Sequence, residues 1–168
     1  MALAWGWGLA EATFFFLVPD VYLTFVALRG LRAGLKAAAA ALGGALMGGS
    51  LMYFWGLHSP HMALAFLSHI PGIHDPLIAR ARVQLEGRGL VAVLLGPLQG
   101  MPYKIYAVQW GVLHGSWGAF LLVSIPARAG RFLLSVLVPF ALRRFVRPWA
   151  LACAWTAFYI SYFWTFGW

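Results

Sequence analysis

The sequence predicts an all-α integral membrane protein, a helical bundle with two Pro-broken re-entrant hairpins that are related as an inverted repeat. Hydrophobic residues make up 62% of the chain and charged residues 10%, and the mean hydropathy is +0.81. Soluble domains carry about 25% charged residues. Two apolar segments are also interrupted by proline and by charged residues, and this pattern predicts the hairpins.

The length of the chain limits the number of membrane segments, and its charge indicates the partners. The chain has 168 residues, which is room for one membrane domain of roughly five segments at about 20 residues per helix. There are 12 Lys and Arg against 4 Asp and Glu, a net charge of +8. In so apolar a chain this excess favours membrane lipids with anionic headgroups as partners, and no nucleic acid. The sequence does not decide between a monomer and a homo-oligomer.

Residues 1–28 form the first predicted broken segment. They are almost continuously apolar, but Glu11, Pro19 and Asp20 interrupt them. A lipid-facing span would not tolerate two carboxylates, so we expect a re-entrant segment, with a simple span as the alternative. No basic residue precedes the apolar run, so we expect no cleaved signal peptide.

Residues 37–57 are the clearest predicted transmembrane helix, because their apolar run is unbroken and rich in Ala and Gly. At about 1.5 Å per residue the run reaches the ~30 Å needed to cross the hydrocarbon core. Ala40, Gly44 and Gly48 recur at every fourth residue. This spacing predicts a face of small side chains at which another helix packs closely.

Residues 58–88 are predicted to be a loop that contains a short interfacial helix. Within the loop, Ile78, Ala81 and Leu85 could share one helical face. Four of the five histidines also fall here, but their spacing is irregular and no cysteine or carboxylate cluster joins them. We therefore expect no metal site.

Residues 89–113 are the second predicted broken segment, since Pro97, Gly100, Pro102 and Lys104 fall together near its middle. A model in which the segment re-enters and a model with five plain spans both place six basic residues inside against three, so charge counting does not separate them. A charge at mid-bilayer costs at least ~2.5 kcal/mol. Lys104 therefore favours the re-entrant model.

Two further transmembrane helices are predicted at residues 117–142 and 149–168. The first carries Arg128 and Arg131 near its centre, at positions i and i+3 that project from neighbouring points of one helix face. The second is rich in aromatic residues and follows Pro148, a residue that favours the first turn of a helix.

A weak internal repeat relates the two halves. The segment PDVYLTFVALRG at 19–30 is similar to PYKIYAVQWGVLHG at 102–115, and each precedes a long apolar helix. Two Pro-broken hydrophobic segments at matching positions of two halves are typical of the central site of a transporter. Chance similarity between apolar helices is the alternative.

Five ionisable residues fall within the apolar segments: Glu11, Asp20, Lys104, Arg128 and Arg131. One hypothesis is that the three basic residues bind an anionic group while the two carboxylates take up and release protons. The other is that these residues form buried ion pairs that hold the bundle together without any substrate. Under either hypothesis we expect both arginines to face the interior and to lie near Glu11 or Asp20.

A family resemblance points in the same direction. Over roughly residues 8–138 the chain contains, in order, EATFFFLVPDVYL, GGALMGGSLMYFWG, EGRGLVAVLLGPLQGMPYKIYAVQWGVL and ARAGRFLLSV. This order resembles the DedA family, also called the VTT or SNARE-associated domain, and is most similar to its short, YqaA-like members. The resemblance implies two Pro-containing re-entrant hairpins that meet between transmembrane helices, in proteins linked to lipid translocation and proton-dependent membrane homeostasis. It also implies that Glu11 and Asp20 are the embedded acids of the family, and that Lys104, Arg128 and Arg131 occupy its basic positions.

These observations predict a membrane transporter that moves an anionic lipid or lipid-linked phosphate between leaflets, with protons as a further partner. A small-solute or ion transporter and a non-transporting scaffold of membrane homeostasis remain as alternatives. An enzyme is not expected, because no nucleophile, base and orienting acid combine and no nucleotide or metal motif occurs. We expect no cofactor. The expected location is the cell membrane, as a multi-pass protein of the bacterial inner or plasma membrane.

Overall fold

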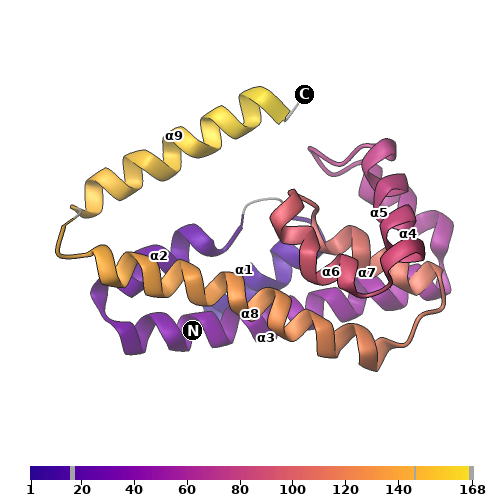
Figure 1. Cartoon of the computed structure of the whole chain (residues 1–168), viewed down its shortest axis with the longest axis horizontal. Helices are drawn as coiled ribbons and strands as arrows, with labels where there is room; N and C mark the ends of the chain where they lie inside the picture. The colour runs from indigo at the N-terminus through magenta and orange to yellow at the C-terminus, as the bar shows by residue number, and fades with distance from the viewer. Residues whose placement is uncertain (16–17, 146, 167–168) are drawn as a thin grey trace.

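The computed structural model describes residues 1–15, 18–145 and 147–166, and these residues form helices joined by short turns (Figure 1). No strand occurs among them, so the predicted all-α class is confirmed. The elements are α1 (Ala2–Thr13), α2 (Asp20–Arg29), α3 (Leu31–His58), α4 (Pro60–Ser68), α5 (Asp75–Arg88), α6 (Val91–Leu95), the 3-10 helix η1 (Gly96–Gln99), α7 (Tyr103–Val112), α8 (Trp117–Leu142) and α9 (Pro148–Phe166).

Two long antiparallel helices, α3 and α8, form the frame of the fold. The space beside Gly34, near the start of α3, is filled by Val136 near the end of α8, whereas Tyr53 near the end of α3 stacks on Phe120 near the start of α8. Both helices are long and apolar enough to span a membrane, and at about 1.5 Å per residue they reach about 40 Å. Their presence suggests a membrane protein.

The bounds of these two helices compare closely with the predicted ones. The predicted helix at 117–142 coincides with α8, and the predicted helix at 37–57 lies inside α3. Helix α3 begins six residues earlier than predicted, at Leu31, because its basic residues do not end it. Arg32 and Lys36 lie exposed on its first two turns, where their charged ends remain in contact with solvent.

Helix α1 packs along the small-residue face of α3. A β-carbon on Gly44 would overlap the carbonyl oxygen of Trp5, and one on Gly48 would meet the side chain of Ala12. The backbones can therefore approach this closely only because glycine occupies these positions. Gly44 and Gly48 are buried as predicted, while Ala40 is half-buried.

The two predicted breaks lie between helices. Residues 14–19 separate α1 from α2, and η1 with residues 100–102 separates α6 from α7. Pro19 and Pro102 immediately precede α2 and α7, as expected for prolines at helix starts. Gly100 has a φ of 71°, a left-handed conformation that glycine adopts without steric cost and that turns the chain into α7.

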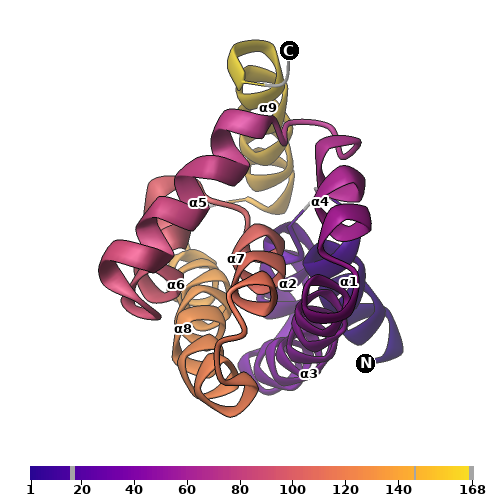
Figure 2. The same ribbon diagram turned by 90° about the vertical axis from the view of Figure 1, so that its right-hand side faces the viewer.

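The region predicted as a loop with one interfacial helix, 58–88, contains two helices, α4 and α5. They lie over the end of the bundle at which α3 finishes (Figures 1 and 2). The predicted helical face is present in α5, whose buried residues are Ile78, Ala81 and Leu85. Helix α4 was not predicted, although Pro60 after Ser59 is a typical helix start.

Helix α9 contacts α2 and otherwise extends away from the bundle (Figures 1 and 2). The predicted C-terminal transmembrane helix at 149–168 is present as a helix, α9, except that its last two residues lie outside the described residues. Among the described residues, the helices long and apolar enough to span are α3 and α8. Trp149, Phe158 and Ile160 are exposed on α9.

Candidate functional site

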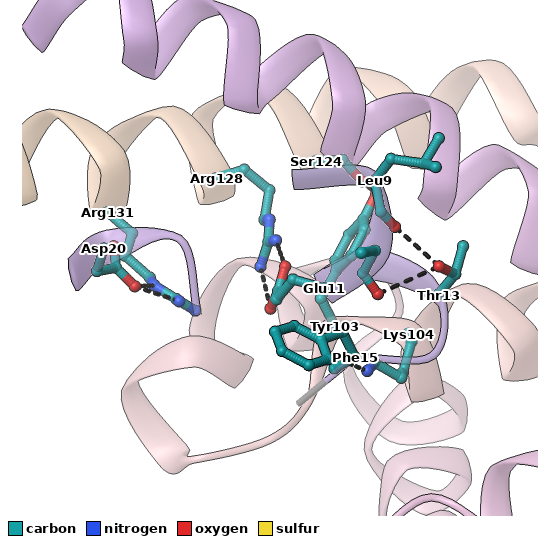
Figure 3. A network of polar contacts seen from close by, with 11 residues as sticks. Leu9, Glu11, Thr13, Phe15, Asp20, Tyr103, Lys104, Ser124, Arg128 and Arg131 are labelled. Carbon is teal, nitrogen blue, oxygen red and sulfur yellow. Dashed lines mark hydrogen bonds and ion pairs between the residues drawn. The ribbon is translucent and has the colours of Figure 1, made fainter. Parts of the chain in front are cut away.

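The five ionisable residues singled out in the sequence lie in one region, where α1, α2 and α7 meet the middle of α8 (Figure 3). Glu11 comes from the last turn of α1 and Asp20 is the first residue of α2. Arg128 and Arg131 lie one helical turn apart on α8, and Lys104 lies in the first turn of α7. Residues from both broken segments therefore meet beside one long apolar helix.

Glu11 and Arg128 form a buried ion pair. Nη1 of Arg128 donates to Oε1 of Glu11 at 3.3 Å, and Nη2 pairs with Oε2. The side chains are 1% exposed for Arg128 and 9% for Glu11. Because two buried opposite charges neutralise each other, neither is left uncompensated in an apolar environment.

Two aromatic rings enclose the Arg128 guanidinium. Its Cζ lies 4.8 Å from the centroid of the Tyr103 ring and 5.1 Å from that of Phe132. Tyr103 is held in place by its hydroxyl, which donates to Ser124 Oγ at 2.9 Å. Attraction between a cation and an aromatic face adds to the ion pair when water is excluded. Nε of Arg128 is buried and has no hydrogen-bond partner among the described residues.

Asp20 and Arg131 form the second ion pair. Nε of Arg131 donates to Oδ2 of Asp20 at 2.9 Å, and Nη2 contacts the same oxygen. The other oxygen, Oδ1, accepts a hydrogen bond from Ser135 Oγ at 2.6 Å. Arg131 is 27% exposed, so the protein encloses this pair less than it encloses Arg128. Both arginines therefore pair with the two embedded carboxylates, and the predicted proximity is confirmed.

Lys104 takes a different partner from the two arginines. It is buried, and its Nζ donates to the carbonyl oxygen of Phe15 at 2.6 Å. That carbonyl lies in the break between α1 and α2, so the bond links the first break to the start of α7 (Figure 3). A cation in the first turn of a helix is opposite to the usual preference, because the helix N-terminus itself carries partial positive charge.

The remaining predicted positions shape the second broken segment. Pro97 lies within η1, Gly100 forms the left-handed turn, and Pro102 precedes α7. A separate polar cluster ties this segment to α5: Gln84 donates to Gln99 at 2.9 Å and accepts from the hydroxyl of Tyr106. Helix α5 is thus fastened both to the break, through Gln99, and to α7 after it, through Tyr106.

Sequence analysis missed four side chains that complete the site: Tyr103, Ser124, Phe132 and Ser135. Three of them lie on α8 and follow from its periodicity, because Ser124 and Phe132 stand four residues to either side of Arg128, and Ser135 stands four residues after Arg131. Residues at i and i+4 share a helix face. That signal could have found these three from the sequence.

The charges of the site do not balance. Three cations (Lys104, Arg128 and Arg131) lie with two carboxylates (Glu11 and Asp20), which leaves one positive charge in excess. Within residues 1–15, 18–145 and 147–166, no three His, Cys, Asp or Glu side chains group so as to hold a metal ion. The arrangement is suited to holding an anion or to exchanging one anionic partner for another.

Comparison with known proteins adds no assignment: no family model, no curated protein and no solved structure matches the chain. The resemblance to the DedA family therefore stays a prediction.

Proposed function

We propose that this chain is a multi-pass protein of the cell membrane, a DedA-type transporter that moves an anionic lipid or lipid-linked phosphate between leaflets, with this movement coupled to protons. The proposal rests on two ion pairs, Glu11 with Arg128 and Asp20 with Arg131. Both arginines come from the middle of a helix that is long enough to span a membrane. Ionisable residues at membrane depth mark substrate and proton pathways.

The proposal includes two re-entrant hairpins related by an inverted repeat. Matching contacts support it: the helix after each break, α2 or α7, packs against both α3 and α8. Asp20, the first residue of α2, reaches Arg131 in the middle of α8. Tyr103, the first residue of α7, lies against Gly49 in α3. A two-fold axis between the halves would exchange α2 with α7 and α8 with α3. It would therefore turn the contact of α2 with α8 into the contact of α7 with α3.

An anionic substrate is supported by the donors that the site holds. The site has one excess positive charge, and Nε of Arg128 is buried without a partner among the described residues. The first turn of α7 begins beside Arg128, at Tyr103, and the first turn of a helix is a favourable place for an anion. Guanidinium groups bind phosphate oxygens through paired, planar hydrogen bonds.

Protonation is the step that would release the arginines for a substrate. When Glu11 or Asp20 binds a proton it loses its charge, and the paired arginine needs a new anionic partner. A phosphate can then take the place of the carboxylate. When the proton leaves, the carboxylate regains its charge and displaces the phosphate. One proton and one negative charge therefore enter and leave the site together.

A structural role without transport is the competing function. One observation favours it: every oxygen of the two carboxylates already has a donor, from Arg128, Arg131 and Ser135. A scaffold works in a single conformation, so carboxylates whose oxygens are all hydrogen-bonded suit this role.

Reconstitution into vesicles tests the proposal. The purified chain is placed in phosphatidylcholine vesicles containing a fluorescent phosphatidylglycerol, and flipping is followed by chemical quenching of the outer leaflet, with and without a pH gradient. We expect the parent to accelerate flipping and Arg131→Gln to abolish the acceleration. The double variant Glu11→Gln/Asp20→Asn should make the rate insensitive to pH, because neither amide can take up a proton.

The matched control is Arg82→Gln, which also breaks an Arg–carboxylate pair but on the exposed face of α5. It should flip lipid at the parent rate. Helix content and size-exclusion profile establish that each variant is folded. If folded Arg131→Gln flips lipid as fast as the parent, the site assignment is wrong and the scaffold role replaces it.

A further inference from the structure

A second concentration of positive charge lies at one end of the bundle, away from the paired arginines. The antiparallel packing of α3 and α8 brings the start of α3 beside the end of α8, as the contact of Gly34 with Val136 shows. The end of α2, the start of α3 and the end of α8 lie at this end of the bundle (Figure 1), and these segments with the turn after α8 carry six exposed basic residues. We call this surface the basic end; it comprises Arg29, Arg32, Lys36, Arg143, Arg144 and Arg147.

No carboxylate side chain of the chain neutralises the basic end. Glu11 and Asp20 are committed to Arg128 and Arg131. The other two, Asp75 and Glu86, lie on α5, which covers the opposite end of the bundle (Figure 1). With three arginines and two carboxylates, α5 has a net charge of +1, against +6 for the basic end.

Large apolar side chains lie among these charges. Phe145 is 84% exposed and Trp149 is 64% exposed, both next to the arginines in sequence. Arg143 lies over the ring of Phe140, with its Cζ 4.0 Å from the centroid. Exposed aromatic rings beside arginines are typical of the level of lipid headgroups, where the ring enters the apolar layer and the cation meets phosphate.

We propose that the basic end is a binding surface for the headgroups of acidic phospholipids. A headgroup phosphate supplies the negative charge that the chain itself lacks there, and the acyl chains cover Phe145 and Trp149. Such binding requires that the chain lies in a bilayer, but it does not depend on transport. The surface is distinct from the paired arginines of the candidate site.

Lipid binding to the purified full chain in detergent micelles tests the inference. The probe is phosphatidylglycerol with a dye on one acyl chain, followed by fluorescence anisotropy, and phosphatidylcholine with the same dye is the comparison. Each basic residue at an anionic surface contributes about a fivefold factor to affinity. The variants Arg143→Gln/Arg144→Gln and Arg32→Gln/Lys36→Gln should each weaken phosphatidylglycerol binding roughly 10- to 30-fold.

Three controls separate binding at the basic end from binding elsewhere on the chain. Arg80→Gln/Arg88→Gln removes two exposed charges from α5 and should leave binding within twofold of the parent. Arg82→Gln removes a further exposed charge from α5 and should also leave it nearly unchanged. Raising salt from about 0.1 M to about 1 M shortens the Debye length from about 10 Å to about 3 Å and should weaken binding of the anionic lipid alone.

The inference is overturned if the two lipids bind equally, or if both variants of the basic end retain the parent affinity while folded. It is also overturned if Arg80→Gln/Arg88→Gln causes the same loss as Arg143→Gln/Arg144→Gln, because binding would then follow the net charge of the chain and not the basic end. Tighter binding of a short single-stranded DNA oligonucleotide than of phosphatidylglycerol would assign the surface to nucleic acid instead.

Discussion

Replacing the buried pair of Glu11 and Arg128 by two methionines should restore most of the stability that either single replacement removes. Each single variant, Glu11→Met or Arg128→Met, leaves one charge buried without its partner. Arg128 is 1% exposed, so water cannot replace the carboxylate. Loss of one partner from a buried pair costs about 3–5 kcal/mol, whereas exchange of both for apolar groups of similar volume is close to neutral.

The double-mutant cycle gives this coupling as a number. Reversible unfolding of the purified chain in detergent, followed by circular dichroism, provides the free energy of unfolding for the parent, both single variants and the double variant. We expect a coupling energy of at least about 3 kcal/mol. The matched control is the pair of Arg82 and Glu86, whose side chains are 49% and 50% exposed. For that pair we expect about 0.3–0.5 kcal/mol.

Additive losses in the Glu11 and Arg128 cycle would refute the reasoning. A coupling energy below about 1 kcal/mol, similar to that of an exposed pair, would mean that solvent or lipid headgroups satisfy the freed charge. The pair would then contribute nothing specific to the fold.

Three further predictions concern topology, packing and the second ion pair. Cysteines at Gly87 and Gly118, both at open exposed positions, should react with an impermeant maleimide from the same side of the membrane in a Cys153→Ala background; labelling from opposite sides would contradict re-entry. Gly44→Val should separate α1 from α3 and lower the free energy of unfolding by about 1–3 kcal/mol through overpacking, measured by the same unfolding assay. Asp20→Asn should cost about 1–2 kcal/mol, less than Glu11→Met, because Arg131 is only partly buried; an equal or larger loss would contradict that order.

Hydrophobic length predicted the long helices well, because an uninterrupted apolar run has few alternatives to a helix. The limits of α8 agree with the predicted residues 117–142, and Ser116 before it accepts a hydrogen bond from the backbone of Ala119. Prolines were harder to interpret. Pro60 falls within the predicted loop at 58–88, yet it lies in the first turn of α4, where its missing N–H group is not needed.

The signs of the charges predicted that the arginines meet the carboxylates, but not which partner each would take. The choice depends on where α1 and α2 lie along α8, and the close packing of α1 on glycines of α3 fixes that position. Lys104 illustrates the limit. Its sign alone would favour a carboxylate, whereas its place in the first turn of α7 brings Nζ to the carbonyl of Phe15.

Three contacts together hold the first break in place. Glu11 before the break pairs with Arg128, Asp20 after it pairs with Arg131, and Phe15 within it accepts from Lys104. Movement of α8 along α1 and α2 would therefore have to open both ion pairs at once. At about 3–5 kcal/mol for a buried charge left unpaired, an open state without new partners would be populated below roughly one part in a hundred. The cost of the unpaired charges is offset when each carboxylate binds a proton and each arginine binds an anion. Under the proposed function, the closed arrangement therefore makes opening depend on both protons and substrate.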